Sequence, residues 1–210
     1  MYTYNELKEI ERQPKINDIS LNTLREYYKY YLYPFIYTYT VKDILGDTKN
    51  IELRFDKENF CHLLGVEYIV KNSISYRELH NFKGKDGWDN IKLNLITYSS
   101  LKLMNKSRFN SVKDKSVFFY LIPTLISEPR AVLYNRSKVN SDTKIECEVL
   151  FYGEYLRVII HLGIEKHSSE DYYVPRTFAI ERITEKNNGR KFVENQQEII
   201  VEKTSRVIMQ

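Results

Sequence analysis

The hydrophobic pattern of the chain changes its period near residue 130, and this change constrains the fold more than any other sequence feature. Residues 111–128 place apolar side chains at helical spacing and predict the clearest amphipathic helix, which Pro123 should kink or weaken in its last turn. Four later stretches read as strands: "RAVLYNR", "TKIECEVLFY", "YLRVIIHLGI" and "YYVPRTFAIERI". A hairpin turn is expected at Gly153-Glu154, between the middle two. Helices followed by antiparallel strands predict an α+β fold with the helices packed on one face of the sheet.

The first 50 residues form a Tyr-rich stretch with its own pattern. A helix should begin after a Ser20 cap and end before Pro34, and tyrosines crowd it. We interpret these tyrosines as the edges of a core-facing helix, and the alternative is a base-stacking platform or a partner surface. Two strands should follow, in "FIYTYTVKDIL" and "NIELRF", whereas "GKDGWDN" reads as a loop. The expected organisation is an extension of residues 1–50, a core domain of residues 51–185 and a tail or extra strand of residues 186–210.

Composition sets limits on the class of protein. The chain has 210 residues, a net charge of +4 and two cysteines without a CxxC motif, so no zinc module and no disulfide framework are expected. The four histidines do not pair at metal-ligand spacing, and we expect no metal and no cofactor. We see no signal peptide and no apolar stretch near 20 residues, which favours a cytoplasmic protein without a membrane partner.

The stretch "FDKENFCHLLG" places a histidine on one short predicted helix. Asp56 is a good N-cap and Gly65 a good stop. The apolar positions share one stripe: Phe60, Leu63 and Leu64. His62 lies nearly opposite this stripe, so it should face away from the core. It is either a solvated surface residue or a functional one.

The stretch "VPRTFAIE" breaks a strand pattern with a proline. Because Pro175 removes a donor from the ladder, the strand should lie at an edge or carry a bulge. Arg176 and Thr177 follow directly, and a bulge would re-aim one of these side chains. The simpler interpretation is an edge strand with a surface arginine.

Several chemistries are not signalled. The chain has no GxGxxG, no GxxxxGK[ST], no HExxH and no GxSxG motif. Histidine, arginine, lysine, tyrosine and hydroxyl side chains remain, and they suit metal-free RNA cleavage. In that reaction a base takes the 2′-OH proton, cations stabilise the pentavalent phosphate and an acid protonates the leaving 5′-oxygen.

The motifs also carry a family resemblance. "FCHLLG" after the strand "IELRF", then "GWDNI", the later helix and the terminal "PRTF" resemble the fourth group of phage-associated Barnase–EndoU–colicin–RelE-like nucleases. The resemblance covers roughly residues 51–182 and implies helices followed by a four-stranded antiparallel sheet, as in metal-independent endoribonuclease toxins. It places the histidine of "HLLG" at His62, and the arginine and hydroxyl of "PRTF" at Arg176 and Thr177.

Both approaches select the same two segments. We expect His62 to exchange protons, Arg176 to hold the scissile phosphate and Thr177 to donate to a phosphate oxygen. The weaker candidates are Arg54 as a second phosphate contact, and Tyr134 and His161 for base stacking or proton transfer. Tyr134 and His161 are expected on strand faces that point away from the apolar runs.

Three functions are compatible with the sequence. The leading hypothesis is an endoribonuclease toxin or antiphage effector that acts on tRNA, mRNA or rRNA. The protein partner expected for such a toxin is a cognate antitoxin or immunity protein. The alternative is a non-catalytic RNA- or protein-binding module with a nuclease-like fold. A phage structural or accessory protein ranks last, because it explains neither the histidine segment nor the arginine segment.

Overall fold

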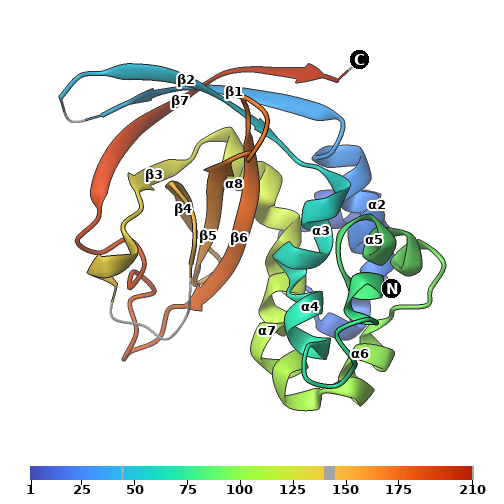
Figure 1. Ribbon diagram of the computed structural model, residues 1–210. Helices are drawn as coiled ribbons and strands as arrows, with labels where there is room; N and C mark the ends of the chain where they lie inside the picture. Colours follow the sequence, from blue (N-terminus) through green and yellow to red (C-terminus); the bar gives the residue numbers. More distant parts are fainter. Residues whose placement is uncertain (44, 140–144, 210) are drawn as a thin grey trace. The chain divides into compact units, whose positions relative to one another are not determined.

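The computed structural model describes residues 1–43, 45–139 and 145–209, and the chain forms two compact units (Figure 1). Residues Met1–Tyr33 and Asp56–Tyr120 make up a helical unit. Residues Pro34–Phe55 and Leu121–Gln210 make up a strand unit. Each unit therefore combines two separate stretches of the chain. The expected division of the chain into domains at residues 50 and 185 stays a prediction.

The helical unit consists of short helices. Its elements are α1 (Tyr4–Lys8), η1 (Ile16–Asp18), α2 (Leu21–Tyr31), α3 (Lys57–Leu64), α4 (Val66–Val70), η2 (Leu79–Phe82), α5 (Gly84–Lys92), α6 (Tyr98–Met104) and α7 (Lys106–Phe118), followed by η3 (Phe119–Leu121). No helix in the described part of the chain is long and apolar enough to cross a bilayer.

Aromatic rings form the centre of the helical unit. Tyr28 of α2 is fully buried, and its ring centroid lies 5.4 Å from that of Phe60, 5.7 Å from Trp88 and 6.2 Å from Phe119. The helix begins after a Ser20 cap, whose side chain accepts from the Thr23 backbone N–H. Its buried tyrosines confirm a core-facing helix with tyrosines at its edges.

The "GKDGWDN" stretch is helical, so its interpretation as a loop is wrong. It forms α5, and Trp88 and Ile91 bury the inner face of this helix. Glycine and aspartate favour turns in isolation, but burial of the apolar face outweighs this preference. Gly87 permits close packing, because a Cβ there would lie 2.8 Å from Cys61 Sγ and from the Phe82 carbonyl carbon.

The predicted amphipathic helix at residues 111–128 is interrupted earlier than expected. Helix α7 ends at Phe118, the single 3₁₀ turn η3 follows, and α8 (Ile122–Ser127) begins anew. Pro123 occupies the first turn of α8, where the missing N–H leaves no helical bond unmade. The proline thus starts the second helix and does not kink the first.

The strand unit is a closed barrel of seven strands, so the expected four-stranded sheet is too small (Figure 1). The mixed α+β class is as predicted. The elements after α8 in the chain are β3 (Arg130–Leu133), η4 (Arg136–Lys138), β4 (Val149–Tyr155), β5 (Val158–Lys166), β6 (Tyr173–Arg182) and β7 (Gln197–Ile208). The earlier strands β1 (Phe35–Lys42) and β2 (Thr48–Arg54) pair antiparallel, as predicted.

The barrel closes because the two early strands and the tail join the four expected strands in the order β1-β2-β6-β5-β4-β3-β7. Strand β1 pairs with β7 over most of its length. Strands β2 and β6 meet in parallel through one residue pair, Leu53 and Tyr173. Lys49 Nζ reinforces this join by donating to the Tyr173 hydroxyl at 3.1 Å.

The hairpin between β4 and β5 turns three residues later than expected. Gly153 pairs with Ile160 inside the ladder, and the turn is made by Leu156 and Arg157, with φ of 47° and 62°. The glycine has another reason to be there, since a Cβ on it would lie 2.7 Å from the Tyr155 ring. The sequence signal was therefore wrong, because it attributed to turn geometry a glycine that makes room for a side chain.

We predict that Arg157→Gly stabilises the protein. A non-glycine residue at this φ costs about 1 kcal/mol, and the second central position of such a turn favours glycine. Thermal unfolding should show a melting temperature about 2–4 °C higher than that of wild type. Arg157→Ala, which retains the Cβ, is the control and should not raise the melting temperature. A melting temperature for Arg157→Gly at or below wild type would contradict the prediction.

Candidate functional site

His62 lies on the exposed face of α3. The helix begins after Asp56 and ends at Gly65, as predicted, and 55% of the His62 side chain is exposed. Its Nδ1 lies 3.1 Å from Oε2 of Glu67. Because a carboxylate only accepts, Nδ1 of the neutral ring carries the proton, and Nε2 is the nitrogen left to act as a base.

Gly65 brings Glu67 to this histidine. Its φ of 73° ends α3 in a left-handed turn, and α4 starts at the next residue. The break places the carboxylate five positions along the chain beside the imidazole, a spacing that a continuous helix would not bring together. Glu67 was not among the residues predicted from the sequence. Gly65 inside a helical stretch was the signal that could have revealed it.

Arg176 is the extra residue of a β-bulge. Thr177 pairs with Gly163 and Pro175 pairs with Ile164, so Arg176 has no opposite residue on β5. This confirms the bulge. Strand β6 pairs with β5 along its length, whereas β2 meets it only at Tyr173, so the stretch that carries Arg176 has a ladder partner on one side and a surface arginine, as the simpler interpretation also expects. Arg176 points outward, with 51% of its side chain exposed and its Nε 3.1 Å from Oε2 of Glu165.

Thr177 is partly buried next to the bulge. A Cβ on Gly163 would lie 3.3 Å from the Thr177 Cβ and 2.9 Å from Cys147 Sγ. Glycine at this position on β5 therefore leaves the room that the two side chains occupy. The threonine is thus fixed by its packing.

Arg54 lies on β2, the neighbour of β6. Its Nη2 is 2.9 Å from Oε2 of Glu52, and its guanidinium carbon lies 4.4 Å from the centroid of the Tyr172 ring. Since the pair Leu53 and Tyr173 joins the two strands, the sheet places Arg54 and Arg176 on adjacent strands of one unit. Both guanidiniums are partly exposed and ion-paired, and each still has N–H groups to offer an anion.

His161 is fully buried, so its expected position on a solvent-facing side of β5 is wrong. It lies beside a hydrophobic cluster, with its ring centroid 5.3 Å from that of Phe192. Burial lowers the pKa of His161 to about 3, against an opposing effect of the Ala179 backbone. The ring is therefore neutral at pH 7 and out of reach of solvent.

Tyr134 packs against the same cluster and is half-buried. Its hydroxyl oxygen is buried and has no hydrogen-bond partner among the described residues. Burial raises the pKa of this phenol. The placement of Tyr134 and His161 does not favour direct contact with a nucleic acid.

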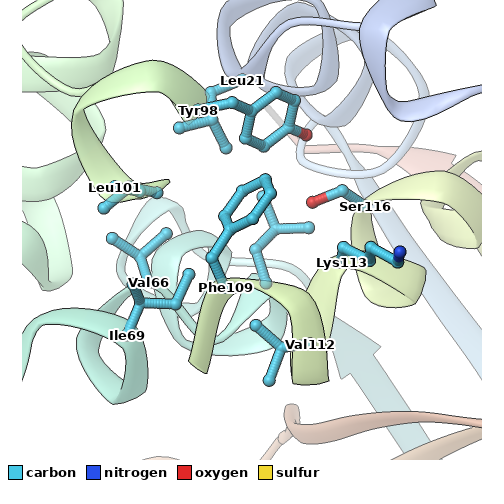
Figure 2. A pocket seen from close by; sticks show the side chains of 10 residues that line it. Leu21, Val66, Ile69, Tyr98, Leu101, Phe109, Val112, Lys113 and Ser116 are labelled. Atoms are coloured by element: carbon cyan, nitrogen blue, oxygen red, sulfur yellow. The ribbon is translucent and has the colours of Figure 1, made fainter. Parts of the chain in front are cut away.

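A small pocket lies within the helical unit (Figure 2). Its lining is mostly apolar, and the Phe109 ring stands among the lining side chains in Figure 2. It has room for about one water molecule. None of the predicted site residues lines it, and it is too small for a nucleotide.

Among the described residues, no group of three or more His, Cys, Asp or Glu side chains is arranged to hold a metal ion. The two thiols lie apart in the sequence, and burial raises the pKa of both Cys61 and Cys147 to about 12.

The burial of His161 predicts a pH dependence of folding. As the pH falls below about 6.5, the unfolded chain protonates this histidine, whereas the folded protein does not until near pH 3. This histidine should therefore lower the free energy of unfolding by about 2 kcal/mol between pH 7 and pH 5. His161→Leu should remove that loss in urea unfolding experiments. His80→Leu, which replaces an exposed histidine, should lose stability between pH 7 and pH 5 as wild type does. An equal dependence of the free energy of unfolding on pH in the two variants would contradict the prediction.

The comparisons with known proteins identify the family. No curated protein and no solved structure matches the chain significantly. The family described as phage-Barnase-EndoU-ColicinE5/D-RelE like nuclease4 matches residues 21–204. The match is wider than the expected range of 51–182, and it includes α2, β1 and most of β7. The chain therefore belongs to this family of phage-associated Barnase–EndoU–colicin–RelE-like nucleases.

Proposed function

We propose that this nuclease-family member is a metal-independent endoribonuclease that cleaves RNA by attack of a ribose 2′-OH on the adjacent phosphate. The observation that carries the proposal is the exposed imidazole of His62, which Glu67 holds by its Nδ1. A carboxylate that orients an imidazole leaves the second ring nitrogen aligned for proton transfer. Such an arrangement suits general acid–base chemistry more than packing.

The reaction needs two proton transfers and a cationic clamp. The 2′-oxygen forms a bond to phosphorus, the bond from phosphorus to the 5′-oxygen breaks, and a 2′,3′-cyclic phosphate remains. His62 Nε2 exchanges one of the two protons, and solvent water exchanges the other. Arg176 holds the scissile phosphate, and Thr177 donates to one of its oxygens.

The ion pairs of the two arginines fit this role. Glu165 and Glu52 keep the guanidiniums of Arg176 and Arg54 in place on their strands without covering them. A phosphate can bind the N–H groups that the carboxylates leave unused. In this proposal Arg54 supplies the second phosphate contact.

The biological role follows from the reaction. We propose a cytoplasmic toxin or antiphage effector whose substrate is tRNA, mRNA or rRNA. A toxin of this kind calls for a cognate antitoxin or immunity protein. Tyr134 and His161 would then support the strand unit and have no contact with the substrate, because both belong to its buried side.

His62→Ala and Arg176→Ala should each reduce RNA cleavage at least about 100-fold, because each removes a group that acts only in the transition state. Induction of wild-type protein should arrest growth and yield RNA ends with 2′,3′-cyclic phosphates, and both variants should be harmless. His80→Ala and Arg130→Ala are matched controls, since they replace an exposed histidine and a half-exposed, ion-paired arginine.

The double variant tests whether the two groups act in the same reaction step. His62→Ala with Arg176→Ala should be hardly slower than either single variant, because residues that act as one unit are not additive. An inert wild-type protein, or variants as active as wild type, would instead favour the non-catalytic binding module.

Glu67→Gln should lower kcat about 10-fold and leave KM unchanged, because the carboxylate orients His62 without touching the substrate. Steady-state kinetics on an RNA oligonucleotide would measure both constants. Glu58→Gln changes an exposed carboxylate of α3, the helix that carries His62, and should leave both constants unchanged. A rise in KM alone for Glu67→Gln would speak against its positioning role.

A further inference from the structure

Tyr68, the residue after Glu67, lies on a second polar surface of the helical unit. Tyr68 of α4 is 49% exposed. Arg108 of α7 stacks on its ring, with the guanidinium carbon 4.9 Å from the ring centroid, and its Nη1 donates to the Tyr68 carbonyl oxygen at 2.9 Å. The arginine thus holds one face of an aromatic ring that solvent reaches.

Three lysines lie on the segments that carry Tyr68 and Arg108 or directly beside them. Lys71 directly follows α4, and Lys102 and Lys106 lie in α6 and α7. The two segments meet where Ser73 Oγ donates to the Met104 carbonyl oxygen at 3.0 Å. All three lysines are exposed, and no described carboxylate forms an ion pair with them.

Acidic residues are scarce on these segments. Residues 66–73 and 98–108 contain one carboxylate, Glu67, and its partner is His62. The two segments therefore carry four cations, which are the three lysines and Arg108, against one carboxylate, although the net charge of the whole chain is only +4.

We propose that this surface, which consists of Tyr68, Lys71, Lys102, Lys106 and Arg108, binds single-stranded RNA beside His62. A base stacks on the exposed face of the Tyr68 ring, and the lysines and Arg108 bind the phosphates on either side. The inference rests on the proposed function, because it makes the surface the part of the substrate site that holds nucleotides next to the cleaved bond.

The composition favours RNA over an acidic protein. Lysine is depleted from protein interfaces, and three of these five residues are lysines. An aromatic ring with cations spaced around it is the arrangement that binds single strands irrespective of sequence. Proximity to the site adds to this, because Tyr68 and the carboxylate that holds His62 are consecutive residues of one helix.

The test measures binding separately from cleavage. In a His62→Ala background, fluorescence anisotropy would follow a labelled oligonucleotide of about 12 uridines. Tyr68→Ala should weaken binding about 10-fold, the effect of losing one base stack, whereas Tyr68→Phe should bind like the background. Circular dichroism would confirm that both variants are folded.

The lysines are tested by salt dependence. Lys71, Lys102 and Lys106 changed together to Gln should reduce the slope of log K against log salt by about 2, since each phosphate contact on a single strand contributes about 0.7. The matched control changes Lys8, Lys15 and Lys29 to Gln. It removes the same charge from α1, the residue before η1 and α2, and should leave the slope unchanged.

Each outcome bears on one proposal. Cleavage by wild type together with unchanged binding in the Tyr68 and lysine variants would overturn the inference and leave the proposed function intact. Weakened binding in those variants, from a wild type that cleaves no RNA, would support the RNA surface and reject the endoribonuclease. Poly-glutamate that competes as well as RNA at equal charge would overturn the inference and assign the surface to an acidic protein.

Discussion

Tyr28 anchors the start of the candidate catalytic helix in the core of the helical unit. Its buried ring contacts Phe60, Trp88 and Phe119, which come from three separate stretches of the chain. Its hydroxyl donates to the carbonyl oxygen of Asp56 at 2.7 Å, and Asp56 is the N-cap residue of α3. One side chain thus supplies both the packing and the hydrogen bond that fix the helix carrying His62. The tyrosines of α2 are needed for structure, and their abundance does not require a nucleic acid.

The sequence predicted local structure well wherever one residue decides the backbone. Asp56 and Gly65 bounded α3, and Pro175 indicated the bulge at Arg176. It failed where distant parts of the chain decide. Strand β7 has a weak pattern of its own and becomes a strand by pairing with β1 and β3. A closed barrel therefore cannot be predicted from the pattern of each segment taken separately.

The site could be predicted in part for the same reason. The helical period alone placed His62 on a polar face. Strand alternation misplaced His161, because alternation separates core from solvent only when one face of a sheet is open to water. Here both faces of β5 are covered, and Phe192 of the tail packs on the face that holds His161. Glu67 escaped notice because its partner lies across a helix break.

The way the chain passes between its two units restricts how such a protein can change. It crosses at 33–34, at 55–56 and at 120–121, and the family match extends over all three crossings. No single cut in the gene would yield either unit by itself, because every cut divides at least one of the two units between the pieces. Transfer of either unit to another gene would therefore require two separate segments of sequence.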